Sequence, residues 1–181
     1  MHTFKDAYIF SSKLYWVAFL LTGHKELSAR VTIDALSSEY GLDCMSSPRL
    51  RALLRRTVIK SALAETQTEL SRSLHQFASQ RTDLGPITVM DKLADPPIGQ
   101  AKLEEALLAI ELFPRCALLL TVFERFPMQD AETLLHCNRN LIQAGQVRGL
   151  SDLARNLGSV SSTKLVPQAI RAQAATSISG S

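Results

Sequence analysis

The sequence feature that most constrains the fold is a spacing of apolar residues by three or four positions, repeated along most of the 181-residue chain. Phe10, Leu14, Val17 and Leu21 show this spacing, which is typical of one face of a helix, and Gly23 after them suits a helix end. Similar segments are residues 26–37, 50–63, 101–110, 117–123, 128–135 and 139–157. The sequence therefore predicts an all-α protein.

The helical pattern lapses between residues 81 and 100. This stretch contains the helix breakers Gly85, Pro86, Pro96, Pro97 and Gly99. We predict two small helical domains, residues 1–80 and 101–160, joined by a linker over residues 81–100. Residues 161–181 are rich in Ser, Ala, Gln and Thr and are predicted to be a flexible tail.

The apolar runs and the cysteines bear on the compartment. The longest apolar run, residues 14–21, is far shorter than the roughly 20 residues that cross a bilayer, and its charged neighbours are unlike a signal peptide. Three scattered cysteines do not form a disulfide framework. We expect a cytoplasmic protein that does not interact with membranes.

Sequence motifs for catalysis are missing. The chain has no glycine-rich phosphate loop, nucleophile elbow or paired-carboxylate motif. His136 and Cys137 are adjacent, but no second pair at metal-ligand spacing accompanies them, which favours a turn residue beside a core thiol over a zinc site. We expect a protein that is not an enzyme and that has no catalytic residue, metal or cofactor.

Positive charge is concentrated in one predicted helix. The chain has 20 Lys+Arg and 17 Asp+Glu, but five cations and no acid fall within residues 49–60, after a start signal at Ser47 and Pro48. These cations are Arg49, Arg51, Arg55, Arg56 and Lys60. A solvated helix face is one reading. The other is an acidic partner such as a phosphate backbone, which would relieve repulsion between cations four positions apart.

The second half has the layout of a helix-turn-helix. A short helix over residues 128–135 is followed by a turn over residues 136–138, in which Asn138 is a suitable N-cap. In a DNA-binding unit, Arg139, Asn140 and Gln143 would then face the major groove, where Arg pairs with guanine and Asn or Gln with adenine. A plain helical hairpin has the same layout.

The order of these features resembles the extracytoplasmic-function sigma factors. Residues 10–36, with their Leu-Thr-Gly turn, resemble region two, and residues 50–63 resemble its next helix, which in the family melts and reads the −10 promoter element. Residues 116–135, followed by His-Cys-Asn-Arg-Asn-Leu-Ile, are similar to region four, which reads the −35 element. The segments stand in the family's order, with a proline-bearing linker between them.

The resemblance implies a sigma factor for transcription initiation and transcription regulation, a DNA-binding protein whose partners are the RNA polymerase core and promoter DNA. An anti-sigma factor is a further partner that the family admits. The residues implied at the −10 element, mainly through phosphates, are Arg51, Arg55, Arg56 and Lys60. Those implied at the −35 element are Asn138, Arg139, Asn140 and Gln143. Glu26 and Asp34 are the implied polymerase contacts.

Departures from the family pattern support a competing hypothesis. Arg30 stands where the family has an acid, and the aromatic residue expected near Ala52 is absent. Arg125 and His136 replace two glycines of region four and Pro127 replaces its serine N-cap, while Gly145 and Gly149 interrupt the last predicted helix at about 1 kcal/mol each relative to alanine. The alternative is a degenerate sigma-like protein-interaction module without sequence-specific DNA recognition.

Overall fold

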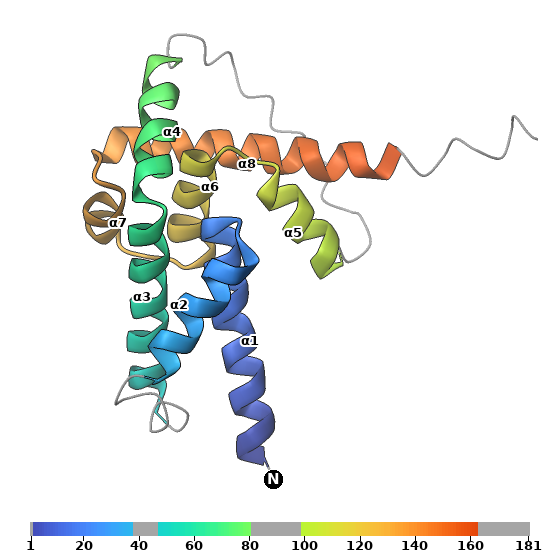
Figure 1. Ribbon diagram of the computed structural model, residues 1–181. Helices are drawn as coiled ribbons and strands as arrows, with labels where there is room; N and C mark the ends of the chain where they lie inside the picture. Colours follow the sequence, from blue (N-terminus) through green and yellow to red (C-terminus); the bar gives the residue numbers. More distant parts are fainter. Residues whose placement is uncertain (1, 38–46, 81–98, 163–181) are drawn as a thin grey trace, which may run out of the picture.

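The computed structural model describes residues 2–37, 47–80 and 99–162, and every regular element in these ranges is helical (Figure 1). The all-α prediction is confirmed for them. Most of the predicted linker and tail, and the loop that the sequence implies around Gly41 between the helical segments 26–37 and 50–63, lie outside the described residues. The elements are α1 (His2–Thr22), α2 (Lys25–Ser37), α3 (Pro48–Glu65), α4 (Gln67–Ser79), α5 (Gln100–Leu108), α6 (Leu112–Leu118), the π-helical segment η3 (Leu119–Phe123), α7 (Met128–Leu135) and α8 (Arg139–Ser162).

The turn between α1 and α2 closes as its sequence predicts. Gly23 has φ +74°, and its amide donates to the Phe19 carbonyl at 2.8 Å. The Thr22 hydroxyl lies 2.8 Å from that of Ser28 and accepts a hydrogen bond from the His24 amide at 3.2 Å. These bonds satisfy polar groups at the turn and direct α2 back against α1.

The segment from Ser47 to Gln80 is helical but divided into two helices. Ser47 is the N-cap of α3, with Pro48 in its first turn as predicted, but the helix breaks at Thr66 and resumes as α4. The Thr66 hydroxyl donates to the Ala62 carbonyl at 3.1 Å. Such back-bonding by threonine competes with the backbone and bends helices. α4 continues close to the direction of α3 (Figure 1).

Pro114 lies inside a helix, although the sequence predicts a break between the helical segments 101–110 and 117–123. It lies in the first turn of α6, where backbone amides have no partner within the helix, so proline removes no bond. The neighbouring amide of Phe113 donates to the Ser73 hydroxyl of α4 at 3.0 Å. After Leu118 the coil widens into η3, and the Glu124 amide then donates to the Leu119 carbonyl at 2.8 Å.

The last predicted helix is continuous through both of its glycines, so the expected interruption is wrong. A Cβ atom at Gly145 would lie 2.9 Å from the Phe113 ring, and one at Gly149 would lie 2.8 Å from the Pro114 carbonyl oxygen. The missing side chains therefore let α8 approach α6 closely. Close packing against α6 accounts for glycines that are unfavourable for an isolated helix.

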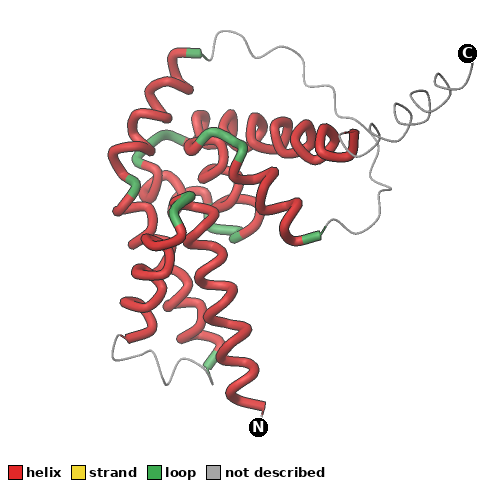
Figure 2. The backbone as a smooth tube through the Cα atoms, turned by 45° about the vertical axis from the view of Figure 1, so that its right-hand side comes forward, coloured by secondary structure: helices red, strands yellow, loops and turns green. Residues whose placement is uncertain are grey.

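The buried side chains form one cluster that draws on both halves of the chain. The backbone view shows the helices of both halves gathered around it (Figure 2). The Phe77 ring of α4 lies 5.1 Å, centroid to centroid, from the Phe113 ring of α6. The Trp16 indole of α1 donates to a Glu104 carboxylate oxygen of α5 at 3.0 Å. The two predicted domains thus share a core, and the boundary between them stays a prediction.

Candidate nucleic-acid interface

The basic helix predicted from the sequence is α3. Its apolar stripe, which includes Leu54, Val58 and Ala62, is buried in the shared core. The stripe orients the helix and leaves the cations on its other faces: the side chains of Arg55 and Arg56 are 45% and 44% exposed. The arginines are therefore accessible at the surface, but they are not without partners.

Arg55 forms a two-pronged ion pair with Glu124. Its Nη2 atom donates to Oε1 of Glu124 at 2.6 Å, and its Nε atom pairs with Oε2. The Glu124 side chain is only 6% exposed, so the carboxylate is nearly enclosed while the guanidinium remains half in solvent. This fork geometry is the one in which arginine also binds phosphate.

Arg56 is held by two groups from the second half. Its Nη2 atom lies 2.9 Å from Oδ2 of Asp130, in the first turn of α7, and its guanidinium carbon lies 5.8 Å from the centre of the Phe126 ring. A third predicted DNA contact, Arg51, lies over the Phe10 ring of α1 at 5.7 Å. Three of the four predicted −10 residues thus contact other parts of the chain.

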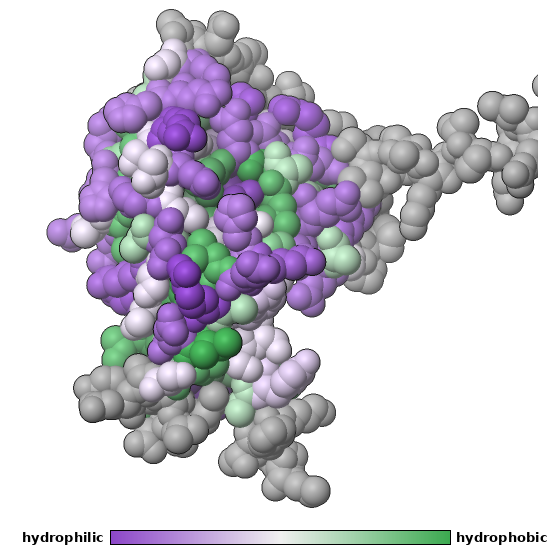
Figure 3. Space-filling model, in the orientation of Figure 1, coloured by the Kyte–Doolittle hydropathy of each residue, from purple (hydrophilic) through white to green (hydrophobic). Residues whose placement is uncertain are grey.

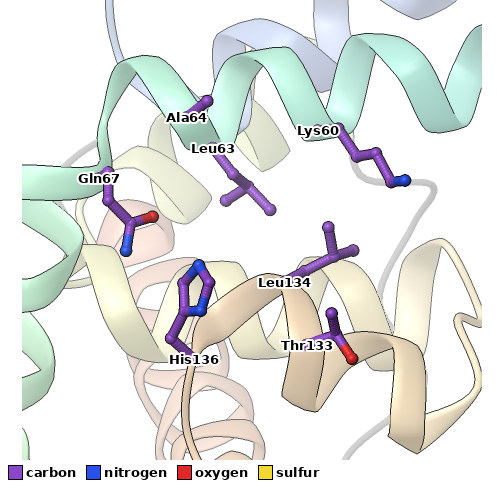
Figure 4. A pocket seen from close by; sticks show the side chains of 7 residues that line it. All are labelled: Lys60, Leu63, Ala64, Gln67, Thr133, Leu134 and His136. Atoms are coloured by element: carbon purple, nitrogen blue, oxygen red, sulfur yellow. The ribbon is translucent and has the colours of Figure 1, made fainter.

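Lys60, the fourth, lines a cleft of about 280 Å³ between the α3–α4 region and α7 (Figure 4). Leu63 and Leu134 face each other across it, with His136 and Gln67 at one end and Lys60 at the other. Apolar side chains line its middle and polar ones its ends. The end of α3 and the turn before α8 therefore lie on opposite sides of one cleft.

The predicted −35 residues lie at the start of α8. α7 ends at Leu135 and α8 begins at Arg139, in agreement with the predicted bounds. Oδ1 of Asn138 accepts a hydrogen bond from the Leu141 amide at 3.0 Å, which confirms Asn138 as the N-cap. Arg139, Asn140 and Gln143 are exposed. Their side chains are open to a ligand, whereas the Asn138 side chain has a structural task.

Two residues around α7 adopt a left-handed backbone. They are Arg125, with φ +53°, and His136, with φ +51°, the two non-glycine residues with positive φ in residues 2–37, 47–80 and 99–162. An L-residue in this region brings its Cβ atom close to the following carbonyl. The chain therefore turns before and after α7 at residues that do not favour the left-handed conformation that they adopt.

The predicted polymerase contacts Glu26 and Asp34 are exposed on α2. Arg30 lies one turn from each of them on the same helix face. Its Nη2 atom is 2.9 Å from Oε2 of Glu65 on α3, and both side chains are about half exposed. The basic residue that departs from the family pattern therefore joins α2 to α3.

Sequence reasoning missed the acidic partners of α3. Glu124 and Asp130 are separated from Arg55 and Arg56 by roughly 70 residues, and no local pattern connects them. The sequence did carry one signal for them: residues 49–60 contain no acid, so their positive charges require an acidic partner from another part of the chain.

Hydrophilic side chains dominate the face shown in Figure 3, and apolar ones appear there in smaller patches.

The described cysteines are not activated thiols. Burial raises the pKa of Cys116 to about 12, against the lowering effect of the neighbouring Arg115. Burial and the nearby Glu132 raise the pKa of Cys137 to about 11. Both are thiols at neutral pH. Within residues 2–37, 47–80 and 99–162 we find no His, Cys, Asp and Glu cluster suited to a metal ion.

None of the helices in the described ranges combines the length and the apolar character needed to cross a membrane. Comparison of the chain with protein-family models, curated proteins and solved structures finds no match.

Proposed function

We propose that this chain is a sigma-factor-like protein of transcription initiation, non-enzymatic and cytoplasmic, which binds the RNA polymerase core and contacts promoter DNA. In this proposal, residues 1–80 are a region-two-like domain and residues 101–160 a region-four-like domain with a helix-turn-helix. Glu26 and Asp34 on α2 contact the polymerase. α3 binds the −10 region, and the start of α8 reads the −35 region.

The observation that carries the proposal is the backbone at Arg125 and His136. Both residues stand where the resembled family has glycine, and both have positive φ. Glycine is the residue that takes this conformation without strain. The chain keeps the left-handed corners on either side of α7 although the glycines are gone, which is expected of a diverged member of such a family.

The exposed residues at the start of α8 supply suitable chemistry. Arg139 can form paired hydrogen bonds with guanine, and Asn140 and Gln143 can do so with adenine, at the N-terminal end of a helix where major-groove readers carry such groups. Asn138 fixes the first turn through its hydrogen bond to the Leu141 amide. Affinity would come mainly from phosphate contacts by arginine and lysine.

One observation favours the alternative, a degenerate sigma-like interaction module without sequence-specific DNA recognition. Arg55 and Arg56, which would bind phosphates in the first proposal, are paired with Glu124 and Asp130. In such a module these ion pairs would be permanent and would only join the two halves. The polymerase-binding residues of α2 would then be the functional surface.

Two measurements with the full chain separate the proposals. Bacterial core polymerase is first tested for capture by the tagged protein, and run-off transcription is then measured with core enzyme and a promoter library. Core capture with promoter-dependent transcripts supports the first proposal. Core capture without transcripts refutes it and supports the alternative, and absence of capture refutes both.

A substitution in α8 tests DNA reading directly. In the first proposal, replacing Asn140 and Gln143 with alanine lowers transcript yield at least tenfold and leaves core capture unchanged, because each well-formed base contact contributes about 1–3 kcal/mol of discrimination. Replacing the exposed Thr68 and Gln76 of α4 is the matched control and is expected to change neither readout. Equal yields from both variants would exclude α8 as the reader.

A further inference from the structure

We propose that Glu124 and Asp130 keep α3 in a closed form, in which two carboxylates occupy the arginines that would otherwise bind DNA phosphates. The inference rests on the proposed function, because α3 is the helix assigned there to the −10 region. It describes how that site is regulated: the second half of the chain competes with DNA for the first.

The first contact has the geometry of a phosphate substitute. Glu124 binds the Nε and Nη2 atoms of the Arg55 guanidinium, so one of the two edges that can hold a phosphate by paired hydrogen bonds is already filled. A phosphate approaching Arg55 would also meet the negative charge of the carboxylate. DNA must therefore displace Glu124 before a phosphate can form the same two-pronged contact with Arg55.

The second contact occupies the adjacent arginine from another direction. Asp130 pairs with Arg56 at 2.9 Å, and the Phe126 ring lies against the same guanidinium. α7, which carries Asp130, contacts α3 itself. The helix thus excludes DNA from this side of α3 as well as neutralising Arg56.

The backbone before α7 is unusual at the residues that make these contacts. The π-helical segment η3 ends next to Glu124, Arg125 has φ +53°, and the Phe126 amide then donates to the Leu120 carbonyl at 2.9 Å. Wide helical turns and left-handed non-glycine residues cost stability and are concentrated at functional sites. Here they place Glu124 and Phe126, on either side of Arg125, against neighbouring arginines of α3.

The two ion pairs can be exchanged for contacts between the same arginines and DNA phosphates. Arg55 and Arg56 remain nearly half exposed, so salt and competing anions can reach both guanidinium groups, although the Glu124 carboxylate itself is nearly enclosed. DNA presents a dense row of phosphates and gains from counterion release. Neither ion pair takes part in core contacts such as Phe77 with Phe113, so exchange of the pairs does not itself remove them, although α7 is also anchored in the core by Ala131 and Leu135.

The test compares two double variants of the full chain that have the same net charge. E124Q/D130N removes both carboxylates of the contact while keeping side-chain size. D6N/E105Q removes two exposed carboxylates on α1 and α5. Affinity for a short non-specific DNA duplex is measured at low salt, and hydrogen exchange of the α7 amides is measured without DNA.

We expect E124Q/D130N to bind the duplex on the order of tenfold more tightly than D6N/E105Q, the size of a typical coupling between two sites. Its slope of log affinity against log salt should steepen by about 0.9 for each arginine released. Exchange of α7 amides should also become faster. Equal affinities of the two variants, or equal absence of binding, would overturn the proposal.

The single variant D130N keeps the test valid if the loss of the nearly enclosed Glu124 carboxylate disturbs folding. The Asp130 side chain is 30% exposed, and its replacement leaves the Arg55 pair intact. D130N should bind DNA more tightly than D6N by about the square root of the double-variant effect, since it releases one arginine of two. Equal binding by D130N and D6N would again contradict the closed form.

Transcription separates this inference from the function on which it rests. If E124Q/D130N binds DNA more tightly but no variant supports a promoter-dependent transcript, the closed form stands and the initiation function falls. If the wild-type protein and both double variants give equal transcripts and equal DNA affinities, the function stands and the closed form falls.

Discussion

His136 ends α7 with φ +51° and ψ +40°, a conformation that costs an ordinary L-residue roughly 1–2 kcal/mol when compared with the right-handed helix. Its side chain lines one end of the cleft beside Gln67 and forms no part of the buried core. The backbone strain is therefore local to this corner. It can be relieved without removing a core contact.

Replacing His136 with glycine should stabilise the protein by about 0.5–1 kcal/mol, because glycine adopts the left-handed region freely and part of that gain is offset by entropy in the unfolded chain. Urea unfolding measures the change. The control is His75→Gly, at an exposed position inside α4, which should destabilise by roughly 1 kcal/mol. Destabilisation by both substitutions would show that the His136 side chain contributes more stability through its contacts than its backbone conformation costs.

Arg115 is the buried cation of α6, with 7% of its surface exposed. Its Nη1 atom donates to the Leu108 carbonyl at 2.9 Å and to the Ile110 carbonyl at 3.4 Å, which ties the end of α5 to α6. Burial lowers its pKa, with a smaller opposing effect from Cys116. The hydrogen bonds compensate part of the cost of burying the charge.

Arg115→Met keeps an unbranched apolar stem but removes the guanidinium and with it these hydrogen bonds. We expect a loss of about 1–3 kcal/mol in the free energy of unfolding, because two carbonyls lose their donor in a buried place. Thermal or urea unfolding checks it. The same change at Arg155, whose side chain is 66% exposed, should have an effect below about 0.5 kcal/mol. Comparable losses at both positions would rule out the proposed role of Arg115.

Single residues with a local structural effect were predictable from the sequence. Gly23 closes α1, Pro48 begins α3 and Asn138 caps α8, because each acts on backbone groups within a few positions of itself. The partner of Arg55 was not predictable. Glu124 lies 69 positions away, and the attraction depends on a fold that brings the two together.

At the scale of helices, the close contact between α6 and α8 depends on the absence of side chains at Gly145 and Gly149. Gly145 faces Phe113 and Ala117, and Gly149 faces the Pro114 carbonyl and Leu118. The sequence shows only that glycine weakens a helix. Which helix approaches it, and how closely, is a property of the packed pair. The sequence therefore predicted α8 correctly but wrongly indicated that its two glycines interrupt it.

Alanine at Gly145 or Gly149 should destabilise the protein by roughly 1–3 kcal/mol, although alanine favours helices, because the new Cβ atom would lie within 3 Å of α6 atoms. Gly158, also in α8, has no atom within 4 Å of such a Cβ. Gly158→Ala should instead raise stability by up to about 1 kcal/mol. Unfolding free energies of the three variants decide the matter, and a gain at all three would refute close packing at Gly145 and Gly149.

At the scale of the whole molecule, the shared core makes the two halves depend on each other for burial. Phe77 of the first half packs on Phe113 of the second, and the sole tryptophan, Trp16, is bonded to Glu104 across the same division. Fluorescence of Trp16 therefore reports on the contact between the halves, while circular dichroism reports on all helices.

The two signals should give coincident unfolding curves, as expected for one cooperative unit. Phe77→Ala should lower stability by about 3–5 kcal/mol and shift both curves together. Tyr8→Ala, at a side chain that is 70% exposed, is the control and should shift neither by more than about 0.5 kcal/mol. Fluorescence that changes before circular dichroism would mean that the halves separate while each remains folded.

α8 is 24 residues long, which corresponds to about 36 Å for a regular helix. It rests on α6 at Gly145 and Gly149, close to the middle of its length, and its first turn carries Arg139 and Asn140. Further along, the Asn156 side-chain amide donates a hydrogen bond to the Ala106 carbonyl at 2.9 Å, and α8 also contacts α5 and α7. A helix held by three others along its length is a rigid mount, so Arg139 and Asn140 are presented in an orientation that contacts far from their own side chains determine.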